Sequence, residues 1–283
     1  MEPKAYRLEA YLPERLVDEG FSWRTLVRLL VGKLARKLTG GRLAPQWPES
    51  VVAYYGQIAV FDKPNQHMGG LAFGRDFPPV LNELGIGRRE RMLEFCAGPG
   101  YIGYSLLAAG WCESLVLADI DADAVSTARF TAAHNELEDR VVVYRSDALD
   151  QIPEAERWDL VVANPPHFAE ANPDTRQYDP GWQLHRRFYA AVGRHMNPGG
   201  LVLMVENLDG SDPELFAEMI RAGGGEAIAV HPSTDIHGEP NDLYYLLSEW
   251  PGVSGSRDSR NRIGSRRPTP SAGSREPVFR PSP

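Results

Sequence analysis

The sequence has few cysteines, no long apolar run and no paired metal ligands. Cys96 and Cys112 are the only cysteines among 283 residues, too few for a disulfide framework or a zinc cluster. No apolar stretch reaches the ~18 residues that cross a bilayer, and the first four residues, Met-Glu-Pro-Lys, do not begin a signal peptide. The histidines are scattered, with no His-Glu-x-x-His pair. We therefore expect a cytoplasmic protein with no membrane segment and no catalytic metal.

Negative charge predominates, but it is unevenly distributed along the chain. Residues 251–283 are rich in Ser, Pro, Gly and Arg and carry a net charge of +5, so that residues 1–250 carry −13. Because this tail has too few apolar side chains to build a core, we expect it to be disordered. The acidic body repels phosphate groups, which disfavours a nucleic-acid partner without excluding one.

The first 45 residues are expected to form a separate N-terminal helical segment. Between residues 15 and 38, apolar side chains recur at three- and four-residue steps with Arg and Lys between them. This spacing predicts an amphipathic helical segment that packs onto the core. Gly40-Gly41 and the Pro-Gln-Trp-Pro run at 45–48 then mark a boundary. Residues 46–250 are expected to form the main domain.

From about residue 90, the hydrophobic pattern alternates between strands and helices. Strands are predicted at 92–95, 114–118, 141–144, 158–163 and 201–205, and helices at 101–109, 122–134, 182–196 and 214–222. A turn at Pro198-Gly199-Gly200 precedes the last of these strands, and strands at 226–231 and 243–248 follow with no helix between them. This order predicts an α/β fold. We expect a Rossmann-like, seven-stranded, mostly parallel sheet with helices on both faces and an antiparallel C-terminal hairpin.

A glycine-rich turn follows the first strand of this series. Gly98 and Gly100 permit a tight turn and a close approach of a ligand to the backbone where the next helix begins. Asp119 ends the following strand, 19 residues after Gly100, where a carboxylate can bind the hydroxyls of a ribose. Asp147 ends the third strand and can accept from an adenine amino group. These strand ends predict a nucleotide-type cofactor site.

Two cofactors fit this pattern, a nicotinamide dinucleotide and S-adenosylmethionine. Glu94, placed just before the glycines, suits a cationic amino-acid portion and would repel a pyrophosphate. The chain also lacks a second mononucleotide-binding half, and its final hairpin departs from the all-parallel dinucleotide fold. The sequence therefore favours S-adenosylmethionine.

The run Asn164-Pro165-Pro166-His167 follows a strongly apolar strand. Pro165 fixes its own φ and biases Asn164 toward extended geometry. The Asn164 amide oxygen and the Pro165 carbonyl are both acceptors, and together they suit a planar NH2 group. His167 can stack on that group or accept its proton after a transfer, and the alternative is an ordinary loop histidine.

Residues 90–250 resemble the class I S-adenosylmethionine-dependent methyltransferases, in the small-domain group that includes HemK-type protein-glutamine and RsmC-type rRNA guanine N-methyltransferases. The resemblance rests on residues 94–103, 118–121, 146–148 and 164–167. It implies that Gly98 and Gly100 border the methionine part of the cofactor, that Asp119 holds the ribose and that Asp147 lies at the adenine. The full set of implied cofactor-binding residues is Glu94, Ala97, Gly98, Gly100, Asp119, Ile120, Asp147, Ala148 and Asn164.

The same resemblance implies that Asn164 and Pro165 bind the acceptor nitrogen. Two residues depart from the family pattern. Cys96 stands where the family usually has Gly, and His167 stands where it usually has Tyr or Phe. The second departure predicts a smaller acceptor, or one that needs a proton-accepting neighbour.

Two segments outside these motifs are expected to complete the site. Residues 168–181 form a polar loop of the kind that closes over an active site, and Phe168 is expected to contact the acceptor. Arg75 lies in a glycine-rich segment before the first strand of the series. It is expected either to pair with a carboxylate of the bound ligands or to be a surface arginine.

The sequence thus predicts a methyltransferase that acts on a planar amide or amine nitrogen of a protein or a small molecule. Three alternatives remain open at this point. The acceptor can be an exocyclic amine of an rRNA nucleobase, the protein can cyclise S-adenosylmethionine and release methylthioadenosine, or it can be a non-catalytic binding protein.

Overall fold

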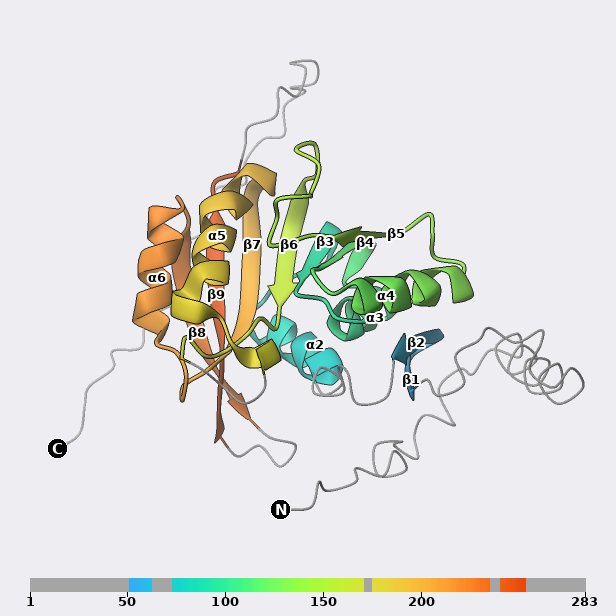
Figure 1. The fold of residues 1–283 in the computed structure, drawn as a ribbon, viewed down its shortest axis with the longest axis horizontal. Coiled ribbons are helices and arrows are strands. Elements are labelled where there is room, and N and C mark those ends of the chain that lie inside the picture. The colour runs from blue at the N-terminus through green and yellow to red at the C-terminus, as the bar shows by residue number, and fades with distance from the viewer. Residues whose placement is uncertain (1–50, 63–72, 171–174, 235–239, 253–283) are drawn as a thin grey trace, which may run out of the picture. The chain divides into compact units, whose positions relative to one another are not determined.

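The computed structural model describes residues 51–62, 73–170, 175–234 and 240–252 (Figure 1). The predicted N-terminal helical segment lies outside the described residues, as does the predicted tail apart from residues 251 and 252.

A seven-stranded sheet forms the centre of the described fold, with the strand order β5-β4-β3-β6-β7-β9-β8. The strands from β5 to β7 are parallel, while β9 is antiparallel to both β7 and β8. The fold class predicted from the sequence, including the antiparallel hairpin, is confirmed. The bounds are β3 (Arg89–Phe95), β4 (Cys112–Asp119), β5 (Val141–Arg145), β6 (Trp158–Ala163), β7 (Met196–Asn207), β8 (Glu226–Thr234) and β9 (Pro240–Trp250).

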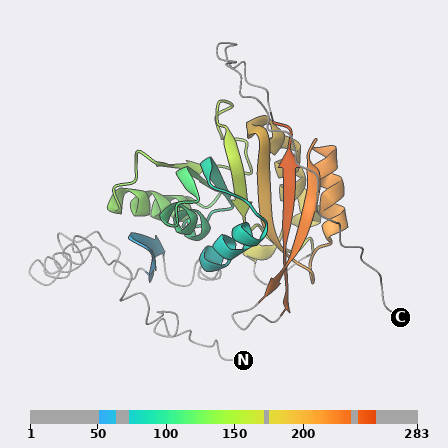
Figure 2. The same ribbon diagram turned by 180° about the vertical axis from the view of Figure 1, so that it is seen from behind.

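Helices cover both faces of this sheet (Figures 1 and 2). One face carries α2 (Phe73–Glu83), α3 (Tyr101–Ala108) and α4 (Ala122–His134), and the other carries α5 (Gln183–Val192) and α6 (Pro213–Ala222). Successive residues of β4 serve opposite faces: Leu115 and Leu117 pack in the first core, Val116 and Ala118 in the second. The central strands are apolar on both sides for this reason. No helix among the described residues is long and apolar enough to span a bilayer.

A β-hairpin, β1 (Val51–Tyr55) and β2 (Ile58–Asp62), precedes α2 and was not predicted. It is tied to the helices by polar contacts. Asn135 accepts from the Ala59 N–H and donates to the Ala59 carbonyl, both at 2.9 Å. The Tyr101 hydroxyl donates to the buried Asp62 carboxylate at 3.0 Å. The hairpin therefore packs with α3 and α4, and the predicted domain bounds stay a prediction.

The segment after α5 differs from the prediction. The α-helix ends at Val192, a 3-10 turn covers Gly193–His195, and β7 begins at Met196. Trp158 of β6 pairs with Met196 while Leu160 pairs with Leu201, so three extra residues of β7 lie between the two pairs. The predicted turn at 198–200 is thus an irregularity within a longer strand.

Candidate active site

The carboxyl ends of β4, β3, β6 and β7 lie side by side, because these four strands are neighbours and run parallel. Phe95 of β3 lies opposite Ala118 of β4 and Ala163 of β6, and Ala163 lies opposite Met204 of β7. The residues that follow these positions meet at one edge of the sheet, which we call the carboxyl edge. Parallel α/β sheets bind their ligands at this edge. It carries the turn 96–100, Asp119, the run 164–167 and Glu206.

The turn between β3 and α3 adopts a left-handed backbone at three residues, Cys96 (φ 54°), Gly98 (φ 53°) and Gly100 (φ 91°). A Cβ at Gly100 would lie 2.8 Å from the side chains of Leu117 and Tyr104, so only glycine fits there. The same conformation costs Cys96 on the order of 1 kcal/mol, because it has a side chain. The left-handed backbone at residue 96 favours glycine, which explains why the family that the chain resembles usually has glycine there.

Asp119 joins the glycine turn to the end of β4. Its Oδ2 accepts from the Gly98 N–H at 2.7 Å, and its Oδ1 accepts from the Asp121 N–H at 2.8 Å. These contacts hold the carboxylate between the glycine turn and the start of the loop before α4. Asp121 itself caps α4 by accepting from the Asp123 N–H. The position of Asp119 fits its predicted role at a ribose, which stays a prediction.

Ala97 and Ile120 flank this aspartate. Ala97 is buried, and its N–H donates to the Ala118 carbonyl at 3.0 Å, which holds the start of the glycine turn against the end of β4. Ile120 leaves 60% of its surface exposed, although it is a large apolar side chain. An exposed apolar surface beside an acidic strand end suits a planar, partly apolar ring such as adenine.

Asp147 lies after the end of β5 and is paired with a residue that the sequence did not identify. Arg187 of α5 donates to Asp147 Oδ1 at 2.9 Å and to Asp150 Oδ2 at 2.7 Å. The next residue, Ala148, is buried with a positive φ of 50°, so the backbone here makes a sharp turn. About half of the Asp147 side chain remains exposed, and its predicted adenine contact stays a prediction.

Glu94 is buried beneath the first turn of α3. Its Oε2 accepts from the Gly103 N–H at 2.6 Å and its Oε1 from the Ile102 N–H at 3.3 Å. A Cβ at Gly103 would lie 2.7 Å from that Oε2. Burial raises the pKa of Glu94 to about 8. The direct contacts of this carboxylate are therefore with the helix backbone, and its predicted contact with a cofactor stays a prediction.

We expect Glu94→Gln to flatten the pH dependence of stability. The folded-state pKa of Glu94 lies above its ordinary value of 4.5, so this group stabilises the fold fully below pH 4.5 and loses that effect as the pH rises through 8. Over this window the free energy of unfolding should fall by up to ~1.4 kcal/mol per pH unit. Urea titrations from pH 5 to 8 should show this decline in the wild type and a smaller one in the variant. Parallel curves would contradict the assignment.

Asn164, just past the end of β6, presents an unsatisfied acceptor at the carboxyl edge. Its Oδ1 is buried and has no hydrogen-bond partner, and Pro165 beside it is buried as well. A buried polar atom without a partner is costly, so the atom fits a ligand that brings an N–H or O–H donor. The structure thus leaves room for the predicted NH2 contact.

Two further buried polar atoms near this run also lack a hydrogen-bond partner, Nδ1 of His167 and Oε2 of Glu206. They lie 3.6 Å apart, too far for a hydrogen bond. The Glu206 side chain is fully buried and the His167 side chain is 12% exposed. His167 therefore faces a carboxylate, in addition to its predicted place at the acceptor.

A buried network of charged groups lies behind Glu206. His185 Nε2 is 3.0 Å from Glu206 Oε1, and His185 Nδ1 is 2.7 Å from Asp179 Oδ2. Burial alone would lower the pKa of His185, but Glu206 and Asp179 outweigh it and raise this pKa to about 9. Burial likewise opposes ionisation of Asp179, yet hydrogen bonds from His185 and the backbone lower its pKa. At neutral pH an imidazolium thus lies between two carboxylates.

Acidic groups on both the glycine-turn side and the Asn164 side of the carboxyl edge act on the thiol of Cys96. Burial raises its pKa well above the usual range, and the carboxylates Asp119, Asp179, Glu206 and Glu94 add to this effect. These four acidic groups come from β4, the segment before α5, β7 and β3. At neutral pH Glu94, with its pKa raised by burial to about 8, is largely protonated, and the other three groups make the region around the glycine turn acidic, which favours a positively charged ligand.

The two remaining predicted residues lie on loops and helices around this edge. Phe168 is partly buried, its N–H donates to the Gln177 carbonyl at 2.9 Å, and its carbonyl accepts from the Asp179 N–H at 2.8 Å. Arg75 is exposed in the first turn of α2, where its charge acts on Tyr55 and Asp76. These interactions do not test the ligand roles predicted for Phe168 and Arg75, which stay predictions.

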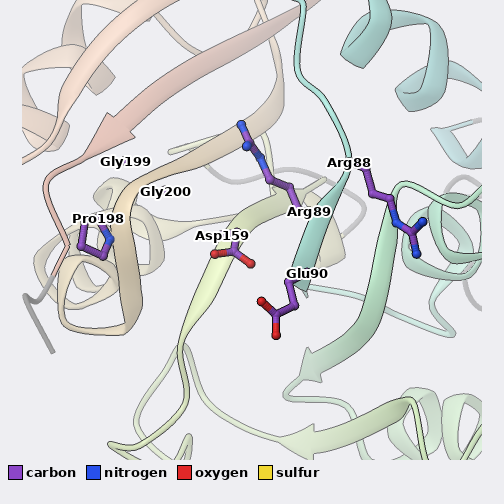
Figure 3. A pocket seen from close by; sticks show the side chains of 7 residues that line it. All are labelled: Arg88, Arg89, Glu90, Asp159, Pro198, Gly199 and Gly200. Atoms are coloured by element: carbon purple, nitrogen blue, oxygen red, sulfur yellow. The ribbon is translucent and has the colours of Figure 1, made fainter. Parts of the chain in front are cut away.

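A cavity of about 260 Å³ lies at the opposite end of the sheet (Figure 3). It lies beside the first residues of β3 and β6 and the irregular part of β7. Its lining residues are Arg88, Arg89, Glu90, Asp159, Pro198, Gly199 and Gly200. Asp159 is committed to structure there, because it accepts from the Arg91 N–H and from Asn197. This cavity shares no residue with the carboxyl edge.

Comparison with known families gives an assignment. The family model of the methyltransferase small domain matches residues 79–222, which is half of the chain. The chain belongs to this methyltransferase family. The resemblance to class I S-adenosylmethionine-dependent methyltransferases that the motifs predicted is thereby confirmed.

Individual relatives of this methyltransferase-family protein are distant. It is 28% identical over 138 residues to the release factor glutamine methyltransferase of Clostridium acetobutylicum, which covers 44% of this chain and 48% of the relative. It is 30% identical over 152 residues to the ribosomal RNA small subunit methyltransferase C of Pseudomonas aeruginosa LESB58, covering 54% and 42%. The chain thus spans about half the length of the curated relatives it matches. SMU.776, assigned as a methyltransferase and solved with SAH, shares the fold with a TM-score of 0.51 and 14% identity, over 81% of this chain and 67% of that one.

The sequence did not identify the buried network of this methyltransferase-family protein. His185 was placed only within the helix predicted at 182–196, although a histidine three, four and seven residues before Phe188, Tyr189 and Val192 indicates a buried polar side chain. Glu206 directly follows the predicted strand 201–205, and a carboxylate there is a comparable signal. The spacing of these residues in the sequence gives no indication that they meet.

Proposed function

We propose that the chain transfers a methyl group from S-adenosylmethionine to a planar amide or amine nitrogen. The observation that carries this proposal is the buried, unpartnered Oδ1 of Asn164, one strand away from the glycine turn. An acceptor oxygen in that place favours a ligand held by its own N–H groups. Family membership supports the same reaction class.

The residues on the glycine-turn side fit S-adenosylmethionine. The acidic surroundings of Cys96 suit its positive charge, and Ile120 offers an apolar surface. Asp119 places a carboxylate between the glycine turn and the end of β4, where it can accept from ribose hydroxyls. When bound, this cofactor supplies an electrophilic methyl group on a sulfonium.

The chain's own contribution to the reaction is to hold the acceptor nitrogen in line. Asn164 Oδ1 and the Pro165 carbonyl accept the two N–H groups of the acceptor, which turns its lone pair toward the methyl group. Because these oxygens carry partial negative charge, they also stabilise the positive charge that develops on the nitrogen. A strong base is not needed for the transfer itself.

The acceptor that we propose belongs to a protein or a small molecule. The two curated relatives are named for a release factor glutamine and for ribosomal RNA, so both classes occur in the family. The net charge of −13 on residues 1–250 favours the first class over an RNA, whose phosphates need basic surface. Incubation of a cell extract with methyl-labelled cofactor, followed by nuclease and protease treatment, distinguishes a labelled nucleic acid, protein and small molecule.

We expect Asp119→Asn to weaken S-adenosylmethionine binding at least about tenfold, because the amide loses the charge and one of the acceptors that hold the glycine turn and a ribose. Isothermal titration calorimetry of the full chain measures this affinity. Asp159→Asn is the matched control, because Asp159 also accepts from a backbone N–H but at the other end of the sheet. Equal affinities for Asp119→Asn and the wild type would remove Asp119 from the cofactor site.

A further inference from the structure

Three buried polar atoms without a hydrogen-bond partner lie on the Asn164 side of the carboxyl edge: Oδ1 of Asn164, Nδ1 of His167 and Oε2 of Glu206. The proposed function accounts for the first of them, which binds an N–H of the acceptor. The other two lie 3.6 Å apart. They complement each other, since an imidazole nitrogen can donate and a carboxylate oxygen accepts.

Of the two carboxylate oxygens of Glu206, only Oε2 lacks a hydrogen-bond partner. Its Oε1 is bound to His185 Nε2 at 3.0 Å, and His185 Nδ1 is bound to Asp179 Oδ2 at 2.7 Å. The other oxygen of Asp179 accepts from the Leu184 N–H at 2.8 Å. Every other polar side-chain atom of this buried series has a partner, so the series ends at Oε2, next to His167.

The surroundings make this arrangement rigid and negatively charged. The His185 ring stacks on Phe216 with centroids 4.8 Å apart and meets the edge of Trp182 at 5.1 Å. The side chains of Asp179, His185 and Glu206 are each 2% exposed or less. With an imidazolium between two carboxylates, one negative charge remains, and the unpartnered oxygen of Glu206 presents it to His167.

We propose that Glu206 is a positioning residue that holds His167 in the tautomer protonated at Nδ1, so that Nε2 of His167 receives the proton that the acceptor nitrogen loses. This proposal rests on the proposed function, because it requires a nitrogen acceptor. At 3.6 Å the Glu206 carboxylate attracts a proton on Nδ1 electrostatically, and when Nδ1 carries the proton, Nε2 of the neutral ring has the free lone pair.

The proton balance of the transfer needs such a group. The lone pair of the acceptor nitrogen forms the new N–C bond, and the C–S bond breaks with its electron pair left on sulfur. The nitrogen then carries a positive charge and one proton in excess. Nε2 of His167 takes this proton, and the charge of the resulting imidazolium lies beside the carboxylate of Glu206. The proton later leaves to solvent.

Long-range proton–nitrogen NMR of the full chain with ¹⁵N-labelled histidine tests this proposal without any acceptor. The spectrum distinguishes the two neutral tautomers and the imidazolium, and His167→Gln assigns the signals of His167. At a pH where its ring is neutral, wild-type His167 should be protonated at Nδ1. In Glu206→Met, no carboxylate attracts that proton, and the signals should move to the tautomer protonated at Nε2. His195, whose Nδ1 contacts the Glu156 carbonyl at 3.1 Å, is the internal control and should not change.

Two results would overturn the proposal. One is a wild-type His167 that is protonated at Nε2, which needs no variant and is therefore independent of whether Glu206→Met folds. The other is an unchanged His167 signal in folded Glu206→Met. Because the measurement involves no methyl transfer, a failure of the proposed function leaves the tautomer result intact, and the reverse also holds.

A rate measurement then links the tautomer to the reaction. With labelled cofactor and the acceptor fraction of a cell extract, Glu206→Met should lower the rate at saturating cofactor at least about tenfold while cofactor affinity stays within about twofold of the wild type. An unchanged rate would show that Nε2 of His167 does not receive the proton.

Discussion

Asn164→Ala should lower the rate of methyl transfer at least about 100-fold and leave S-adenosylmethionine binding within about twofold of the wild type. The alanine removes the buried Oδ1 that has no partner within the protein and that we assign to the acceptor nitrogen. Without it, the nitrogen loses one of two hydrogen bonds that turn its lone pair toward the methyl group. Labelled methyl incorporation measures the rate, and calorimetry measures cofactor affinity.

A matched control for this variant exists at the other end of the sheet. Asn197 donates to Asp159 Oδ1 at 2.7 Å, far along β6 from Asn164, so Asn197→Ala removes an asparagine amide without touching the carboxyl edge. It should transfer methyl groups at nearly the wild-type rate. If Asn164→Ala binds cofactor and turns over as fast as Asn197→Ala, the acceptor is not held by Asn164.

His185→Ala should lower the free energy of unfolding by about 3–5 kcal/mol, because it leaves the carboxylates of Asp179 and Glu206 buried without their common cation. Urea denaturation at pH 6.5 measures this difference. His195→Ala is the matched control. His195 is also buried and stacks on Trp158, but its Nδ1 contacts only a backbone carbonyl. An equal loss of stability in the two variants would contradict the ionic role of His185.

The pH dependence of this effect has a definite sign. The folded-state pKa of His185, about 9, lies above its ordinary value of 6.5, so the stability that it contributes is complete below pH 6.5 and is lost as the pH rises through 9. The wild-type free energy of unfolding should therefore fall by roughly 3 kcal/mol over this window. His185→Ala should lack the decline. Between pH 8 and 9 the comparison is free of Glu94, whose own window ends near pH 8.

Regular elements of the sheet could be read from the sequence because local pattern and burial agree there. The helix predicted at 122–134 has those bounds in the structure, and β6 was placed at 158–163 from its apolar run alone. Strands buried on both faces need apolar residues at every position, which leaves a clear signal. The side-by-side strand ends followed from this parallel order, and with them the places of Asp119 and Asn164.

Other elements could not be predicted, for identifiable physical reasons. Pro78 and Pro79 lie inside α2, and prolines argue against a helix interior, although Phe77, Val80 and Leu81 provide a buried face. The hairpin β1–β2 is only five residues per strand and depends on Asn135 and other residues far along the chain. The pairing of Asp147 with Arg187 likewise joins residues 40 positions apart. Such contacts depend on the tertiary fold and leave no local pattern.

The position of β9 has a consequence for how the protein is made. β9 is the last strand within the described residues, yet it lies between β7 and β8 in the sheet, where Tyr244 pairs with Glu206. A nascent chain that ends before Pro240 can already form the parallel strands around the glycine turn. The free edge of β7, with Glu206 on it, stays open until β9 inserts, and an open edge can pair with other chains. During translation, the strand that carries Glu206 is therefore paired on both sides only after the strands around the glycine turn and Asn164 have been made.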